Sequence, residues 1–255
     1  TELHMHYFNV AAYNSVFSLG ASEKPDYLPA MMDGTLHHVH LRWQRDQLQH
    51  FFARFNDLGW KTFSGWPDIS GLNGVLKFDE EQGRLRVDSK DVSVLSPQKP
   101  PINMKLFATD LEWKRQSNKA FALNIHDLSV LHPNLELNAS GQVIKSDVDA
   151  SPVLDLHGRF KVMGAEYWKP WLPHEYLKPK FYDWLQYDIK TLPQVIGSFA
   201  VQGDWEHFPF DKGEGKFRID MAGEDVQLAI APGWPVAHSV KGSLSVQGRT
   251  LSGTI

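Results

Sequence analysis

Apolar and polar side chains alternate along Leu154-Asp-Leu-His-Gly-Arg-Phe-Lys-Val162. In an extended strand, a period of two sends successive side chains to opposite faces. The same alternation recurs elsewhere in the chain: 39–43, 85–87, 135–143 and 216–221. Strands that are apolar on one face and charged on the other are typical of antiparallel sheets with one solvated face. The pattern therefore predicts a mainly β protein built from antiparallel strands.

Residues 165–192 break this pattern and are rich in aromatic side chains. From Pro179 to Ile189 the apolar residues fall at helical spacing, and a proline suits the first turn of a helix. We therefore expect a short helical segment near 166–190, within a helical insert that spans 165–192.

An internal repeat divides the chain. Trp66-Pro and Gly74 recur as Trp234-Pro and Gly242, at an offset of 168 residues (66 to 234). Self-similarity of this kind predicts related structural units. We expect 1–255 to be one continuous segment with two pseudo-repeat units, at about 30–96 and about 190–255. Further strands at 97–164 and the helical insert at 165–192 join these units. Residues 45–57 have helical spacing, but they align with the alternating stretch 213–225, which favours a strand.

Composition excludes several function classes. The net charge of −4 removes the attraction that nucleic-acid binding needs, so we expect no nucleic-acid partner. The chain has no cysteine, which excludes disulfides, cysteine nucleophiles and thiolate zinc sites. Its sequence has no glycine-rich phosphate loop, no G-x-S-x-G elbow and no H-E-x-x-H motif. We therefore predict no enzyme, no catalytic residue and no cofactor.

Histidines are the one candidate metal-binding group. His4 and His6 form one alternating pair, and His38 and His40 form another. Two such pairs on neighbouring strands could bind zinc or a non-haem metal, as in a metal-dependent β-barrel enzyme. The alternative is that the imidazoles lie on the polar face beside Arg42. Because no acidic second shell is visible in the sequence, we predict no metal site.

The aromatic residues of the helical insert also have two interpretations. They could stack on sugars or gather at the level of lipid headgroups, or they could pack a helix against the sheet. We favour packing for Trp168, Trp171, Tyr176, Trp184 and Tyr187.

Several motifs resemble one family. They are Trp171-Leu-Pro with Tyr176-Leu-Lys-Pro-Lys-Phe-Tyr-Asp-Trp-Leu185, Gln202-Gly-Asp-Trp205, Ala231-Pro-Gly-Trp-Pro235 and Gly65-Trp-Pro-Asp-Ile-Ser-Gly-Leu-Asn-Gly74. The sequence resembles the YhdP-type branch of the AsmA-like proteins of Gram-negative bacteria, relatives of TamB. This resemblance covers about 30–250.

The resemblance implies a periplasmic protein anchored to the inner membrane by an N-terminal helix outside this chain. It implies a long, twisted antiparallel sheet curled into an open groove, whose apolar inner face shields phospholipid acyl chains on the way to the outer membrane. The expected partners are phospholipids and the two membranes, reached through parts outside this chain, and we expect a monomer. The chain begins and ends inside strand-like runs, which also suggests a segment of a longer protein.

Alternation alone fits two architectures. An open groove and a closed β-sandwich both need strands that are apolar on one face, so the alternative function is a sandwich that binds glycans or protein partners. For the groove, the expected lipid-binding residues are the apolar members of the alternating strands: Leu154, Leu156, Phe160, Val162, Phe199, Val201, Phe217, Ile219, Val226, Leu228, Ile230, Leu244 and Val246.

Overall fold

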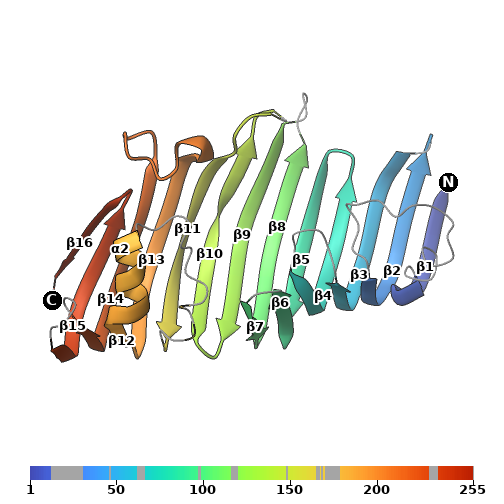
Figure 1. The fold of residues 1–255 in the computed structure, drawn as a ribbon. Coiled ribbons are helices and arrows are strands. Elements are labelled where there is room, and N and C mark those ends of the chain that lie inside the picture. The colour runs from blue at the N-terminus through green and yellow to red at the C-terminus, as the bar shows by residue number, and fades with distance from the viewer. Residues whose placement is uncertain are drawn as a thin grey trace. The chain divides into compact units, whose positions relative to one another are not determined.

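The computed structural model describes residues 1–12, 31–45, 47–61, 67–96, 99–115, 120–147, 149–164, 167, 169, 179–229 and 235–254. All sixteen strands of these residues belong to one open antiparallel sheet, which confirms the predicted mainly β fold (Figure 1). The chain divides into two compact units. Unit 1 comprises Thr1–His132 and Gln142–Ala150, and unit 2 comprises Pro133–Gly141 and Ser151–Ile255.

Unit 1 is built around seven neighbouring strands, in the order β1-β2-β3-β4-β5-β8-β9. Their bounds are β1 Glu2–Asn9, β2 Met31–Gln44, β3 Gln47–Lys61, β4 Asp68–Asp79, β5 Gln82–Ser89, β8 Leu106–Arg115 and β9 Phe121–His132. A hairpin of β6 (Val92–Ser96) and β7 (Lys99–Met104) pairs with the first residues of β4. The stretch 45–57, which has both helical and strand spacing, therefore lies largely in a strand, β3.

Unit 2 contains the order β11-β13-β14-β15-β16, with β12 paired to β14. The bounds are β11 Val153–Met163, β12 Ile189–Thr191, β13 Gln194–Asp204, β14 Lys216–Ala229, β15 Val236–Gln247 and β16 Thr250–Thr254. Strand β10 (Leu135–Lys145) begins in unit 2 and ends in unit 1. A short 3-10 turn, Trp205–His207, follows β13.

Part of the insert that was predicted to be helical, 179–192, is continuously described, and its first part is a helix. This helix consists of α2 (Pro179–Asp183), which continues as one π-helical turn to Asp188. The Lys169 ammonium donates to the carbonyl oxygens of Gln186 and Ile189 at 2.7 and 2.8 Å, so a cation satisfies the helix C-terminus. Ile189 was expected in this helix but is buried in β12, because it pairs with Leu228 of β14.

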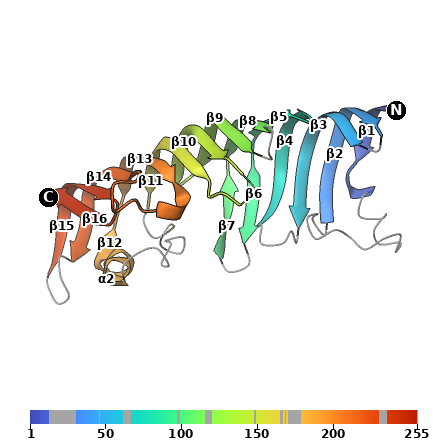
Figure 2. The same ribbon diagram turned by 90° about the horizontal axis from the view of Figure 1, so that it is seen from above.

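A row of β-bulges bends the strands of unit 1. In Figure 2, β2, β3 and β4 turn part-way along their length, and β6 and β7 lie along the turned part. The turn coincides with register shifts after Asp33 and Phe55 and with positive φ angles at Gly34 (107°) and Asp57 (51°). A Cβ on Gly34 would lie 2.6 Å from the Asp57 carbonyl oxygen, so only glycine fits there. Bulges bend strands and increase their twist, which accounts for the turn.

Asn73 satisfies backbone groups that the bulges free from the ladder. Its Oδ1 accepts from the Asp57 amide at 3.0 Å, and its amide group donates to the Gly71 carbonyl oxygen at 3.0 Å. The Asn73 backbone amide donates to Oγ of Ser89 at 2.7 Å, and this side chain is only 1% exposed. Buried backbone polar groups are costly without partners, so these bonds stabilise the bend.

The bulges of unit 1 recur in unit 2 at the offset of the sequence repeat. In β3 and β4, Leu58 pairs with Leu72, and in β14 and β15, Val226 pairs with Val240. Each pairing follows a residue in the left-handed region, Asp57 at φ 51° and its counterpart 168 residues later at 56°. The repeated sequence therefore encodes the same irregular strand pair twice.

The buried core of unit 1 is small and lies at this bend. Phe55, Leu72, Val87, Val92 and Met104 form it, and they come from strands on both sides of the bulges. Apolar side chains of β4, β5 and the β6–β7 hairpin pack around this cluster. Because residues before and after the bend meet in one cluster, the apolar face of the sheet lies inside the bend.

Candidate functional site

The residues expected to bind lipid in unit 2 share one face of the sheet. Phe199 lies directly opposite Ile219, which lies opposite Val246, on β13, β14 and β15. Leu156 and Phe217 flank Val201 in the same way. Directly opposed residues of antiparallel strands project to the same face. We name this surface the unit 2 apolar face, and its members with described side chains are Leu154, Leu156, Phe160, Val162, Phe199, Val201, Phe217, Ile219, Val226, Leu244 and Val246.

Two expected residues have no described side chain. Leu228 is paired with Ala237 through its backbone, and Ile230 lies outside the described residues.

Exposure shows that no described layer seals this face. Val226 is 7% exposed, and the ten other members of the unit 2 apolar face are only half-buried. In the middle of a two-layer core such side chains would be almost inaccessible. Among the described residues there is one sheet and no second sheet facing it, in contrast to the sandwich alternative.

Unit 1 has an equivalent surface that the expected site residues did not include. One row of register partners runs across six strands: Leu41, Phe51, Phe78, Gly83, Trp113 and Leu123. A second row runs beside it: Ala53, Leu76, Leu85, Leu111 and Ile125. We name these two rows the unit 1 apolar face. The alternation at 39–43 and 85–87 was the available signal, but the rows become visible only once the register is known.

Aromatic rings occupy the space above glycines on both apolar faces. Gly74 and Gly158 are direct partners of Phe55 and Phe199. A Cβ on either glycine would lie 2.6 Å from the facing ring. Gly83 and Gly197 are covered in the same way by Trp113 and Phe160: these pairs also face each other in the register. Each ring therefore fills the space that a side chain at the facing glycine would take.

The opposite face of unit 1 is charged. Arg84 donates to both carboxylate oxygens of Asp110, at 2.7 and 2.6 Å, and Arg86 donates at 2.9 Å. The hydrogen bond from Arg84 lowers the pKa of Asp110 to about 2, and Arg86 adds to this shift. These residues alternate with Leu85 and Leu111 along β5 and β8, so apolar and charged side chains separate to the two faces.

We expect Asp110→Asn to destabilise the chain by about 1–2 kcal/mol at pH 7. The folded pKa of Asp110 is below its ordinary value of 3.8, so its stabilising effect is complete above that value. This effect is lost as the pH falls from about 4 toward 2. Urea unfolding at pH 7 and at pH 2 measures the difference. Asp220→Asn is the control, because Asp220 pairs with Arg218 at a more exposed position and should cost less. An equal cost of Asp110→Asn at both pH values would contradict the prediction.

Only one histidine of each pair joins a stack of rings. His4 lies directly opposite His40, with ring centroids 4.1 Å apart. The register between β1 and β2 has no shift, so His6 lies opposite His38, but no backbone bridge joins these two residues and His38 has a positive φ of 52°.

Most of the aromatic residues expected to pack the helix have no described side chain. Tyr187 is 65% exposed, which does not fit the packing interpretation. Trp168, Trp171 and Tyr176 lie outside the described residues, as does the side chain of Trp184.

A family model described as YhdP protein matches residues 26–254. The chain belongs to the YhdP family. It is also similar to the intermembrane phospholipid transporter YhdP of Escherichia coli (strain K12), with 21% identity over 187 residues. This match covers 72% of the chain and 15% of the relative, so the chain corresponds to a small part of that protein. No solved structure matches the chain. The described part of this YhdP-family chain has no helix long and apolar enough to span a membrane.

Proposed function

We propose that this chain is one segment of a bridge that carries phospholipids between the inner and outer membranes through the periplasm. Acyl chains would lie on the unit 1 and unit 2 apolar faces. The observation that carries the proposal is the row of half-buried apolar partners across adjacent strands, such as Phe199, Ile219 and Val246. Large contiguous apolar surface that remains accessible usually marks a binding site.

The mechanism needs no bond chemistry. Each methylene group kept from water is stabilised by about 0.8 kcal/mol. Rows of similar side chains run across successive strands, so this stabilisation would be nearly equal from one strand to the next. The rings over Gly74, Gly83, Gly158 and Gly197 fill the space above these glycines. An evenly apolar surface retains an acyl chain without trapping it at one position.

The family relationship supports the same substrate. The relative's name describes intermembrane phospholipid transport, and two ends of such a path must reach two membranes. We place the inner-membrane anchor and the contacts with the outer membrane in parts of the protein outside this chain. We assign this segment no catalytic role and no cofactor for lipid transport, and we propose that it acts as a monomer and as one continuous segment.

Native mass spectrometry of the chain, purified without detergent from the periplasm of Gram-negative cells, tests the proposal. We expect phospholipid masses to remain bound to the folded chain, because the apolar faces need a cover in water. A folded, lipid-free chain from the same preparation would contradict the proposal and favour a binding module for another partner.

A further inference from the structure

A second cluster of functional side chains lies on the charged face of unit 1, away from the apolar rows. His40 and Phe52 are register partners, and the row continues through Lys77 to Arg84, which belongs to the charged face. His4 of β1 joins this row as the direct partner of His40. Glu2 precedes His4 by two residues and therefore projects to the same face.

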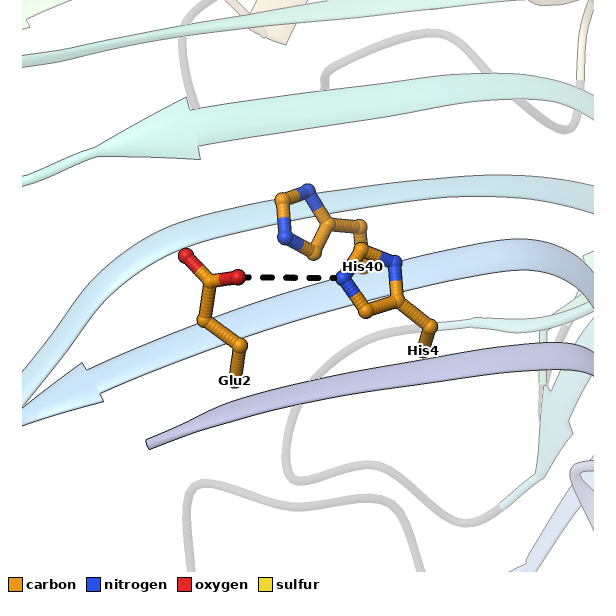
Figure 3. Close-up of side chains that lie close together, drawn as sticks. All are labelled: Glu2, His4 and His40. Carbon is orange, nitrogen blue, oxygen red and sulfur yellow. Dashed lines mark ion pairs between the residues drawn. The ribbon is translucent and has the colours of Figure 1, made fainter.

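Three potential ligand atoms converge at this point. One carboxylate oxygen of Glu2 and one ring nitrogen each of His4 and His40 all lie within 4.8 Å of one another. Figure 3 shows the Glu2 carboxylate beside the ring of His4 on β1, with the ring of His40 on β2 stacked against that of His4. The rings of His4 and His40 are nearly parallel, with an interplanar angle of 14°, and the Glu2 carboxylate lies 3.9 Å from Nε2 of His4.

His40 contains a buried polar atom without a partner. Its Nε2 is inaccessible to solvent and makes no hydrogen bond to any residue that the structure describes. The ring of His4 covers one side of the imidazole, and the ring of His50 lies near it with a centroid distance of 5.3 Å. A buried donor or acceptor left unsatisfied is destabilising, and native structures usually supply a partner. A ring nitrogen of His40 also lies within 4.8 Å of the other two ligand atoms, which points to a metal ion as that partner.

We propose that Glu2, His4 and His40 bind a divalent transition-metal ion, with zinc as the representative. Two imidazoles and one carboxylate are a donor set that zinc accepts, with a fourth position left for water. Ligand atoms around tetrahedral zinc lie about 3.3 Å apart, and an imidazole binds a metal in the plane of its ring. Because the two rings are stacked, the His4 ring must rotate out of the stack when the ion binds. Glu2 and His4 are exposed and free to make this adjustment.

The role of the ion is structural. Its ligands come from two neighbouring strands, so a bound ion ties β1 to β2 in addition to their backbone ladder. The site is on the charged face, so the ion stays clear of acyl chains on the unit 1 apolar face. Arg42 is the register partner of Glu2, and its positive charge opposes a second cation. We therefore expect an affinity below that of fully buried zinc sites.

Isothermal titration of the untagged 255-residue chain with zinc chloride tests the site. We expect one ion per chain, and we expect Glu2→Gln or His4→Gln to lower the affinity by about tenfold or more, since even outer-shell partners of a metal contribute that much. Both substituted side chains are exposed, so the variants should fold. His40→Ala should have the same effect on affinity.

The controls are His6→Ala and His38→Ala, which remove histidines from the same two strands outside the cluster. We expect both to bind zinc as the parent does. X-ray absorption of the zinc-loaded chain should show two imidazole ligands. Failure of the parent to bind one ion, or an equal loss of affinity in the His6→Ala and His38→Ala variants, would overturn the site. Neither result would affect the lipid-binding proposal, because the metal ligands and the apolar rows lie on opposite faces.

Discussion

Ile219→Asp should remove phospholipid from the unit 2 apolar face while the chain remains folded. Ile219 lies in the middle of the row from Phe199 to Val246 and is half-buried rather than sealed in a core. An ionised carboxylate among acyl chains costs about 3 kcal/mol, which is roughly a hundredfold in local lipid occupancy. Native mass spectrometry measures the bound lipid, and thermal unfolding of the same sample measures stability.

The matched control is Ala200→Asp on the neighbouring strand. Ala200 has Arg218 as its register partner, so the new carboxylate lies on the charged side of unit 2 beside a cation. We expect this variant to retain the parent's lipid and stability. Unfolding of Ile219→Asp together with a lipid-free parent would show that Ile219 belongs to a closed core, and the proposed open face would be wrong.

Gly83→Ala should destabilise the chain by about 2–3 kcal/mol, a larger effect than expected for a surface strand. A Cβ at Gly83 would overlap the ring of Trp113, its register partner on β8, and would lie 2.7 Å from Cβ of Phe78. The ring must then leave the glycine and project from the unit 1 apolar face. Thermal unfolding should show a melting temperature lower by about 5–10 °C.

A double-mutant cycle separates this overlap from the ordinary effect of adding a methyl group. In a Trp113→Leu background, Gly83→Ala should cost about 1–2 kcal/mol less than in the parent, because the smaller side chain leaves room and only the approach to Cβ of Phe78 remains. Gly213→Ala is the second control. Gly213 has a φ of 85°, and a Cβ added there would have no atom of another described residue beyond its chain neighbours within 4 Å, so its cost is conformational, at about 1 kcal/mol. If Gly83→Ala lowers the stability equally in both backgrounds, the position of the Trp113 ring does not depend on the glycine.

Strand content and face assignment could be predicted from the sequence because both follow from a period of two. Leu154 to Val162 alternates without interruption, and β11 covers all of it. The repeat at an offset of 168 residues also predicted related structural units, since Leu58–Leu72 and Val226–Val240 occupy the same position after a bulge. A local pattern is sufficient wherever the structure depends on neighbours along the chain.

Features that depend on pairing between strands could not be predicted from the sequence. Asn73 stabilises a bend through Asp57 and Ser89, each 16 residues away, and no local signal reveals this. The rings over glycines need the register, because Gly83 and Trp113 are 30 positions apart in the sequence. Of the two histidine pairs, only His4 and His40 stack their rings, and the positive φ at His38 has no signal in the sequence. Such contacts are set by the sheet as a whole rather than by the residues alone.

The central claim, that one face of this sheet holds acyl chains, is tested most directly by photo-crosslinking along a single strand. A benzophenone amino acid placed in turn at Phe199, Ala200, Val201 and Gln202 of β13 alternates between the two faces. After illumination with vesicles that contain a radiolabelled phospholipid, the variants at Phe199 and Val201 should acquire label, and those at Ala200 and Gln202 should not. Equal labelling at all four positions, or none at Phe199 and Val201, would contradict the account.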